Sequence, residues 1–372
     1  MHMKKTNTLK AIDFFCGSGG MTSGFKNAGI EVLAGIDIEK GCEETYIENN
    51  KPAKFLCEDI KEMTFEKLIQ ETEIEKNDDK LIFIGCSPCQ YWSVISTDKT
   101  KAAKTKNLLQ DFQNFVEYFK PGYVVLENVP GITTRKESPL QSFLKFLDEN
   151  NYGYDNKIIN VSHYGVPQTR KRYILLASRI SEKKEIKIPE PDTKENPPTV
   201  GQFIIDDPDF YEIECGHKDL TEFNHTVAGL HQDNIERLKL TPEGCGNENW
   251  RTDSRLKIKA HENNNGFKDV YGRMHRDKVG PTITTKFFSI SNGRFGHPTQ
   301  LRAISIREGA TLQTFDKSYV FKGTSVAANA RMIGNAVPPA LAERIANTIV
   351  KNHEENTIKV NSSKKEAIKE GN

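Results

Sequence analysis

Short apolar runs alternate with helical patterns through the first ~180 residues of this chain, and this alternation constrains its fold more than any other feature. The apolar runs predict strands at Ala11–Phe15, Val32–Ile36, Leu81–Ile84, Tyr123–Leu126 and Tyr173–Ala177. Helical patterns lie between them, at Met21–Ala28, Glu43–Asn50, Leu108–Phe119 and Leu140–Glu149. We therefore predict an α/β fold whose sheet is mixed but mostly parallel and carries helices on both faces.

A proline-rich stretch that begins at Pro189 interrupts this alternation and predicts a linker. The following residues are rich in Asn, Gly, Lys and Arg, with short β-like runs such as Pro281–Thr285. Helical patterns return at Ile306–Gln313 and at Pro339–Lys351.

These breaks predict two domains and a tail. Residues 1–188 and 325–356 are expected to form one large domain, and residues 189–324 a smaller, irregular, β-containing one. Residues 357–372 are polar and charged, and we expect a disordered tail there.

Composition narrows the class of protein. Hydrophobic residues make up 36% of the chain and charged residues 28%, which is ordinary for a globular protein. No apolar run approaches the ~20 residues that span a bilayer, so we expect no membrane association and a cytoplasmic location, or a nuclear one in a eukaryote. Seven cysteines in 372 residues do not make a disulfide framework. We expect them to be free thiols, of which one can be reactive.

Charge is unevenly distributed although the formal net charge is only +1. Between Arg251 and Arg302 there are 11 Lys or Arg residues against 4 Asp or Glu residues. A local excess of this kind can form a phosphate-facing surface on a protein that is neutral overall. An ordinary solvated face explains the same excess, and the sequence leaves both interpretations open.

A glycine-rich turn follows the first predicted strand, in Asp13-Phe14-Phe15-Cys16-Gly17-Ser18-Gly19-Gly20. Glycines let a backbone turn tightly and approach a ligand without a Cβ in the way. The second strand ends near Asp37, 20 residues after Gly17, at a spacing that suits hydrogen bonds to ribose hydroxyls. Asp59 follows a short third strand and is placed to face an adenine amino group. Thr22 stands where a dinucleotide site would have a third glycine, which favours S-adenosylmethionine over NAD; a tight turn without a ligand is the alternative.

A Cys-x-x-Cys pair follows the next predicted strand, in Ile84-Gly85-Cys86-Ser87-Pro88-Cys89-Gln90. A zinc site would need a second pair of Cys or His ligands at matching spacing, and the sequence has none. A thioredoxin-like redox pair would open a helix near the first strand of a small domain, whereas this pair enters a long polar loop over Ser93–Lys106. Buried structural thiols are the remaining interpretation.

Five segments of the chain resemble the motifs of the DNA cytosine-5 methyltransferase family. The nucleophile, glutamate and Gln-x-Arg-x-Arg motifs of that family are similar to Pro88-Cys89-Gln90, Glu127-Asn128-Val129 and Gln168-Thr169-Arg170-Lys171-Arg172. Its last two motifs are similar to Arg307-Glu308-Gly309-Ala310-Thr311-Leu312-Gln313 and Gly334-Asn335-Ala336-Val337-Pro338. The resemblance implies a Rossmann-like sheet, a target-recognition domain in the smaller unit, S-adenosylmethionine as methyl donor with S-adenosylhomocysteine as product, and no metal.

The resemblance also implies the chemistry. Cys89 would add as a thiolate to carbon 6 of a cytosine, which makes carbon 5 nucleophilic. Glu127 would hold N3 and the 4-amino group, and Arg170 and Arg172 would fix the base O2 and grip a flanking phosphate or the catalytic loop. A structural ion pair between Arg172 and Glu127 is an alternative. Carbon 6 is unreachable in a stacked duplex, so the base must be flipped out.

Further site residues follow from the same resemblance. The expected cofactor-binding residues are Phe15, Gly17, Gly19, Asp37, Ile38, Asp59, Ile60, Pro88, Asn335 and Val337. The expected DNA-binding residues are Gln90, Ser93, Arg251, Arg273, Arg276 and Arg294. The lysine-bearing loop Ser93–Lys106 is expected to close on the DNA.

We expect a monomer that acts on double-stranded DNA, and a restriction endonuclease that acts on the same site is a candidate partner. An RNA cytosine-5 methyltransferase would share the catalytic motifs, but the long separation of Arg172 from Arg307 leaves room for a DNA-reading domain. A catalytically inactive homologue would need a damaged nucleophile or turn, and Cys89, Glu127 and Gly17 are all intact.

Overall fold

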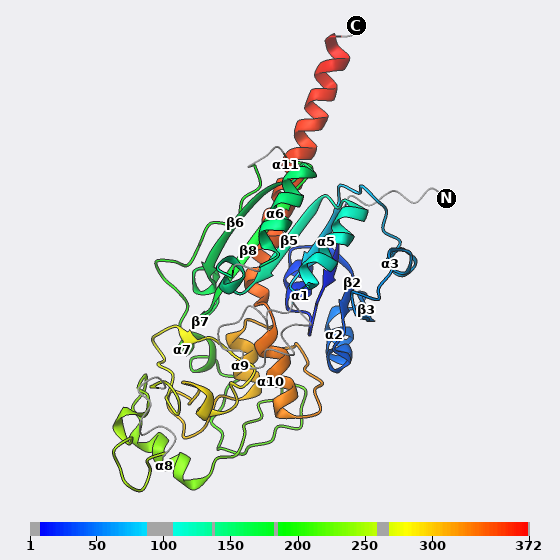
Figure 1. Ribbon diagram of the computed structural model, residues 1–372. Helices are drawn as coiled ribbons and strands as arrows, with labels where there is room; N and C mark the ends of the chain where they lie inside the picture. The colour runs from blue at the N-terminus through cyan, green and yellow to red at the C-terminus, as the bar shows by residue number, and fades with distance from the viewer. Residues whose placement is uncertain (1–7, 88–106, 136–137, 182–184, 259–267, 371–372) are drawn as a thin grey trace.

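The computed structural model describes residues 8–87, 107–135, 138–181, 185–258 and 268–370, with side chains as far as Lys359. A seven-stranded sheet in the order β3-β2-β1-β4-β5-β8-β6 forms its centre (Figure 1). The pairs from β3 to β5 are parallel, and β8 is antiparallel to both β5 and β6. The strands are β1 (Lys10–Phe14), β2 (Glu31–Asp37), β3 (Lys54–Cys57), β4 (Leu81–Gly85), β5 (Tyr123–Asn128), β6 (Gly153–Asn160) and β8 (Lys171–Ser178).

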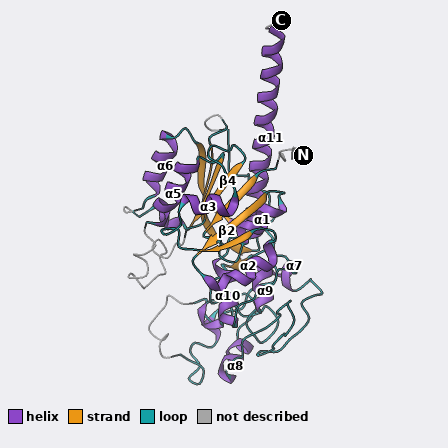
Figure 2. Cartoon of the chain, turned by 90° about the vertical axis from the view of Figure 1, so that its right-hand side faces the viewer, coloured by secondary structure: helices purple, strands orange, loops and turns teal. Residues whose placement is uncertain are grey.

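Helices cover both faces of this sheet, as predicted. Figure 2 shows α5 and α6 on one side of the strands and α1 and α11 on the other. The described α-helices are α1 (Gly20–Asn27), α2 (Glu43–Asn50), α3 (Phe65–Thr72), α5 (Leu108–Phe119), α6 (Leu140–Glu149), α7 (Val200–Ile204), α8 (Gln232–Leu240), α9 (Ile306–Leu312), α10 (Val326–Asn335) and α11 (Pro339–Glu370).

The central strands are mostly apolar because both of their faces are buried. On β4, Ile82 and Ile84 join the core that α1 and α11 cover, whereas Leu81 and Phe83 join the core beneath α3, α5 and α6. Successive side chains of a strand point to opposite faces, so a strand covered on both sides reads as a continuous apolar run. This is why the sequence predicted these strands well.

The sequence predicted other parts of the secondary structure wrongly or not at all. The β-like run Pro281–Thr285 forms only a two-residue strand, β9 (Gly280–Pro281), which pairs in parallel with β7 (Gln168–Thr169). The edge strand β6 was missed because polar residues fill most of it. The expected disordered tail is instead helical as far as Glu370: residues 357–370 lack proline and glycine, and they extend a helix already nucleated by packing.

Residues beyond the proline-rich stretch gather at one end of the sheet, where α7, α8, α9 and α10 lie in Figure 1. This region contains little regular structure, yet its apolar side chains continue the core on the α1 and α11 face. Its contributors include Val200, Ile283, Phe287 and Ile304. Within the described part of the chain, no helix has the length and apolar character to cross a membrane.

Candidate active site

The glycine turn after β1 is held by the carboxylate at the end of β2. Phe15, Gly17 and Gly19 have φ values of 62°, 51° and 88°, and the glycines adopt this left-handed region without strain. The amide of Gly17 donates to Asp37 Oδ2 at 2.8 Å, and the amide of Glu39 donates to Oδ1 at 2.8 Å. Burial raises the pKa of the Asp37 carboxyl, although both of these hydrogen bonds oppose the rise.

The segment after α10 returns to this turn, as expected. A Cβ on Gly20 would lie 2.2 Å from the carbonyl oxygen of Val337, so only glycine permits the approach. The hydroxyl of Ser18 donates to the carbonyl of Met332 at 3.3 Å. Val337 is buried and Asn335 is exposed. The strap, as we call residues 335–337, therefore lies against the first turn of α1.

Buried polar side chains form hydrogen bonds behind the glycine turn, and the sequence did not predict these contacts. Tyr319 donates its hydroxyl to the carbonyl of Ser18, and Asn50 donates to the Tyr319 hydroxyl at 3.0 Å. The hydroxyl of Thr22 donates to Asp13 Oδ2 at 2.7 Å, and burial raises the pKa of Asp13 to about 7. A glycine in place of Thr22 could not make this bond, which explains physically why the third glycine of a dinucleotide site is absent.

The surface beside the turn is open. A Cβ on Gly17 would meet no described atom within 4 Å, so the face next to Asp37 is open. Ile38 follows this carboxylate with 67% of its surface exposed. Ile60 is buried after β3, next to Asp59. An open apolar surface flanked by carboxylates suits an adenosine, whose ring packs against it while its hydroxyls and amino group donate.

The expected catalytic glutamate and one arginine meet on neighbouring strands. Glu127 is the penultimate residue of β5 and is 8% exposed, and its Oε1 lies 2.7 Å from Arg172 Nε on β8. The ion pair that the sequence left as an alternative is therefore formed. Asn128 donates to both the carbonyl and the hydroxyl oxygen of Ser87 at 3.2 Å, a contact that the sequence reasoning did not foresee. This contact holds Ser87, the residue directly before the nucleophile motif.

Four expected site residues lie outside the described residues, namely Pro88, Cys89, Gln90 and Ser93, together with the rest of the loop to Lys106. Cys86 is described: it follows β4, is partly buried and packs against the core. Among the described residues, no three His, Cys, Asp or Glu side chains gather where they would hold a metal ion.

The structure corrects the role expected for Arg170. This side chain is only 3% exposed, and it donates to the carbonyls of Ile283, Gly334 and Ala336 at 3.0, 3.2 and 3.3 Å. Its guanidinium donates to three backbone carbonyls that belong to different segments of the chain. In this structure Arg170 therefore holds these segments together from the interior.

A second correction concerns the expected DNA-binding arginines. Arg273 is 8% exposed and donates to the carbonyls of Pro298 and Gln300 at 3.1 and 3.4 Å, so it is structural. Arg294 pairs with Asp269 and donates to the carbonyl of Gly244 at 2.7 Å. The charge of these arginines suggested contacts with DNA. In the structure they instead bind backbone carbonyls and a carboxylate of the protein itself, which the sequence alone did not reveal.

The remaining candidates are less buried. The Nε of Arg276 lies 3.3 Å from Oε1 of Glu243, and Arg251 is partly exposed. A hollow of about 560 Å³ opens beside the β7–β9 pair. Its lining includes Thr169, Lys278, Thr282, Thr284, Asn292 and Arg294.

The fold is that of a Rossmann-like α/β protein with a glycine turn after its first strand. The model of the family described as C-5 cytosine-specific DNA methylase matches residues 9–351. The chain belongs to this family, and its activity is that of a DNA cytosine-5 methyltransferase. The prediction made from the motifs is confirmed.

Individual relatives agree in length as well as in sequence. The Type II methylase M.HgiDII of Herpetosiphon aurantiacus is 35% identical over 345 residues, which cover 91% of this chain and 94% of that protein. The Type II methyltransferase M1.HphI of Haemophilus parahaemolyticus is 29% identical, covering 92% and 87%. Among solved structures, the Entamoeba histolytica methyltransferase EhMeth has a TM-score of 0.63 at 16% identity and covers 93% of this chain and 99% of its own, which supports the shared fold.

Proposed function

We propose that this protein methylates carbon 5 of a cytosine within a specific double-stranded DNA sequence, with S-adenosylmethionine as donor, as the modification partner of a restriction endonuclease. The observation that carries the proposal is the position of Glu127 and Arg172. They lie at the same sheet edge as the glycine turn, next to Ser87, which precedes the nucleophile motif. The Type II names of the relatives support the pairing with an endonuclease, and DNA as substrate favours the cytoplasm of a bacterium.

The cofactor would be held by residues that this edge already orders. Asp37 would accept the ribose hydroxyls, Ile38 and the strap would cover the adenosine, and Asp59 would accept the adenine amino group. The open face at Gly17 supports this arrangement. Bound S-adenosylmethionine supplies the methyl group, and the chain supplies the orientation of the base towards it.

The chemistry on the base would use Cys89 and Glu127. The Cys89 thiolate forms a bond to carbon 6, carbon 5 takes the methyl group, the carbon 5 proton leaves, and elimination restores the thiolate. Arg172 Nε forms an ion pair with Glu127 Oε1. This contact would orient the carboxyl group towards N3 and the 4-amino group of the cytosine. Gln90 and Ser93, in the loop after Cys89, are proposed to contact the DNA.

We assign residues 1–188 and 325–356 to the catalytic domain and residues 189–324 to target recognition, with DNA between them. Support comes from the strap, which joins the later segment to the first. The hollow beside β7 and β9 and the partly exposed Arg251 and Arg276 lie in the recognition region. A single copy of the chain is proposed to carry out the reaction.

The test is bisulfite sequencing of DNA from cells that express the gene and lack other cytosine methylation. We expect complete methylation at one short sequence. Cys89→Ser should abolish methylation, whereas Cys86→Ala should keep substantial activity because Cys86 packs against the core at the end of β4. A duplex with 5-fluorocytosine at the target should trap an adduct that mass spectrometry places on Cys89. Methyl transfer to RNA with none to DNA, or an adduct on Cys86, would refute the proposal.

A further inference from the structure

Three buried polar side chains join the cofactor edge to the recognition region, and we call them the polar node: Gln168, Arg170 and Gln313. Gln168 and Gln313 are fully buried, and Gln168 Nε2 donates to Gln313 Oε1 at 2.6 Å. Gln168 Nε2 also donates to the carbonyl of Leu312 at 3.0 Å, at the end of α9. The node therefore connects β7, the β7–β8 junction and the residue that follows α9.

On the cofactor side, the node holds the strap. The amide of Gln313 donates to the carbonyls of Ile333 and Ala336 at 2.7 and 3.0 Å. Arg170 donates to the same Ala336 carbonyl at 3.3 Å. Ala336 precedes Val337, whose own carbonyl lies against Gly20. Two node side chains thus converge on the residue that sets how closely the strap approaches the glycine turn.

On the other side, the node holds Ile283 at both of its backbone groups. The amide of Ile283 donates to Gln168 Oε1 at 3.1 Å, and its carbonyl accepts from Arg170 at 3.0 Å. Its neighbours Thr282 and Thr284 line the hollow beside β7 and β9. A displacement of this segment would therefore break hydrogen bonds made by the same side chains that fix the strap.

Buried amides and carbonyls are seldom left without partners, so the bonds of the node resist independent movement of either segment. We propose that the polar node couples cofactor binding to DNA binding, with Gln313 as the positioning residue: an ordered strap holds Ile283, and DNA that holds the segment around Ile283 orders the strap. The proposal rests on the proposed function, and thermodynamic linkage makes the coupling equal in both directions.

The chain contains a second buried connection that serves as a matched control. Arg307 donates to the carbonyls of Tyr319 and Phe223 at 2.9 and 2.5 Å, and the Tyr319 hydroxyl donates to Ser18 in the glycine turn. Tyr319→Phe removes a support of the turn but no bond to Ile283 or to the strap. It should weaken cofactor binding without changing its dependence on DNA.

The experiment measures the affinity of the full-length protein for S-adenosylhomocysteine by calorimetry, with and without a duplex that carries the site found by bisulfite sequencing. In the wild type, we expect the duplex to tighten binding about tenfold. Gln313→Met should bring the ratio of the two affinities close to one, because methionine keeps the volume but cannot bridge to Ala336. Arg170→Lys should also reduce the ratio, and it keeps the test open if Gln313→Met does not fold.

Tyr319→Phe should weaken both affinities alike and keep the wild-type ratio. A wild-type ratio of one in a protein that methylates DNA would overturn the coupling while leaving the proposed function intact. So would a Gln313→Met variant with the wild-type ratio. A wild type that neither methylates DNA nor binds S-adenosylhomocysteine would overturn the proposed function itself.

Discussion

Backbone amides hold the side chain of Asp37 in place at the end of β2. Each of its oxygens already accepts one amide hydrogen bond, from Gly17 and from Glu39. A carboxylate oxygen has a second lone pair, so each can also accept a ribose hydroxyl. The amides aim the carboxylate before a ligand arrives, which lowers the entropic cost of binding.

The raised pKa of Asp37 predicts how cofactor affinity depends on pH. In the proposed cofactor site, the charged form would accept the ribose hydrogen bonds, so affinity should be complete above the raised pKa and should fall as the pH drops through it. The fall should begin at a higher pH than for an ordinary aspartate. Asp37→Asn should weaken binding roughly tenfold or more, because a hydrogen bond to a charged group contributes about 1.5–3 kcal/mol. Calorimetric titration with S-adenosylhomocysteine from neutral to acidic pH measures both; an equal acid loss in the variant would contradict this role.

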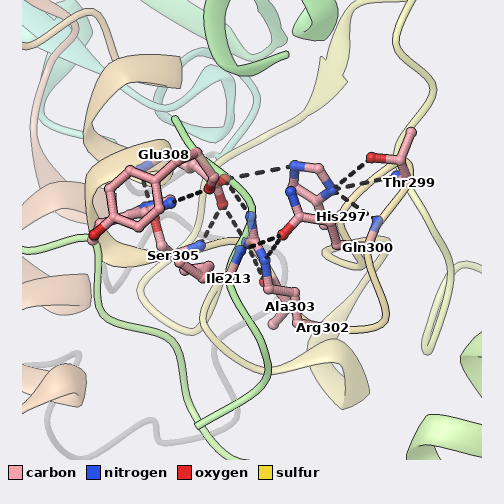
Figure 3. A network of polar contacts seen from close by, with 10 residues as sticks. Ile213, His297, Thr299, Gln300, Arg302, Ala303, Ser305 and Glu308 are labelled. Carbon is pink, nitrogen blue, oxygen red and sulfur yellow. Dashed lines mark hydrogen bonds and ion pairs between the residues drawn. The ribbon is translucent and has the colours of Figure 1, made fainter. Parts of the chain in front are cut away.

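Among the helices, α9 depends on a buried charge. Figure 3 shows Glu308 facing Arg302, whose guanidinium donates to its two oxygens at 2.8 and 2.7 Å. Glu308 also accepts from the amide of Ser305 at 2.7 Å and so caps the helix. Burial alone would raise the pKa of Glu308, but Arg302 and His297 hold it at about 2. Burial lowers the pKa of His297 to about 3, so this histidine is neutral near pH 7.

Glu308→Gln should destabilise the fold by about 3–5 kcal/mol, because it leaves the buried Arg302 without a counter-charge. The folded pKa lies below the unfolded one, so the contribution of Glu308 is complete above its ordinary value of 4.5 and is lost as the pH falls towards 2. Urea unfolding at neutral and acidic pH measures the difference. Glu354→Gln on the exposed side of α11 is the control and should change stability little. Equal effects of the two variants would show that the buried pair is dispensable.

The elements that the sequence predicted best are those whose signal is local. The predicted bounds of α2, α5 and α6 match the structure residue for residue, and the glycine turn and Asp37 meet as expected. Helix α10 was missed because small and polar residues hide its apolar face. The partners of Gln168, Gln313 and Arg170 lie far away along the chain, so only the tertiary fold decides that these side chains are internal. The same holds for Arg273, whose charge suggested DNA.

For the whole molecule, the excess of basic residues between Arg251 and Arg302 is smaller at the surface than in the sequence. Arg273 and Arg302 are buried, and Arg276 and Arg294 face carboxylates. We therefore expect the exposed lysines of this region to contribute more to the attraction of DNA phosphates than these arginines do. Lys278, at the hollow beside β7 and β9, is exposed and well placed for it.

Lys278→Ala should reduce the slope of log affinity for DNA against log salt concentration by about one, because one phosphate contact is lost. Arg273→Ala should instead lower the stability of the fold and leave the slope nearly unchanged in the folded fraction. Fluorescence anisotropy with a labelled duplex at several salt concentrations gives the slope. Lys351→Ala on α11 is the control, and a change there as large as in Lys278→Ala would argue against the assigned DNA face.

The contact between Gly20 and Val337 has a consequence for the order in which the protein is made. A ribosome synthesises the glycine turn before the strap, and the strap emerges only after the whole segment between them has been translated. Until then, the side of the turn that Val337 will cover lacks this contact. Products of premature termination before α10 therefore lack the strap, and if the strap completes the cofactor pocket as proposed, the cell's DNA meets an active enzyme only after translation has passed it.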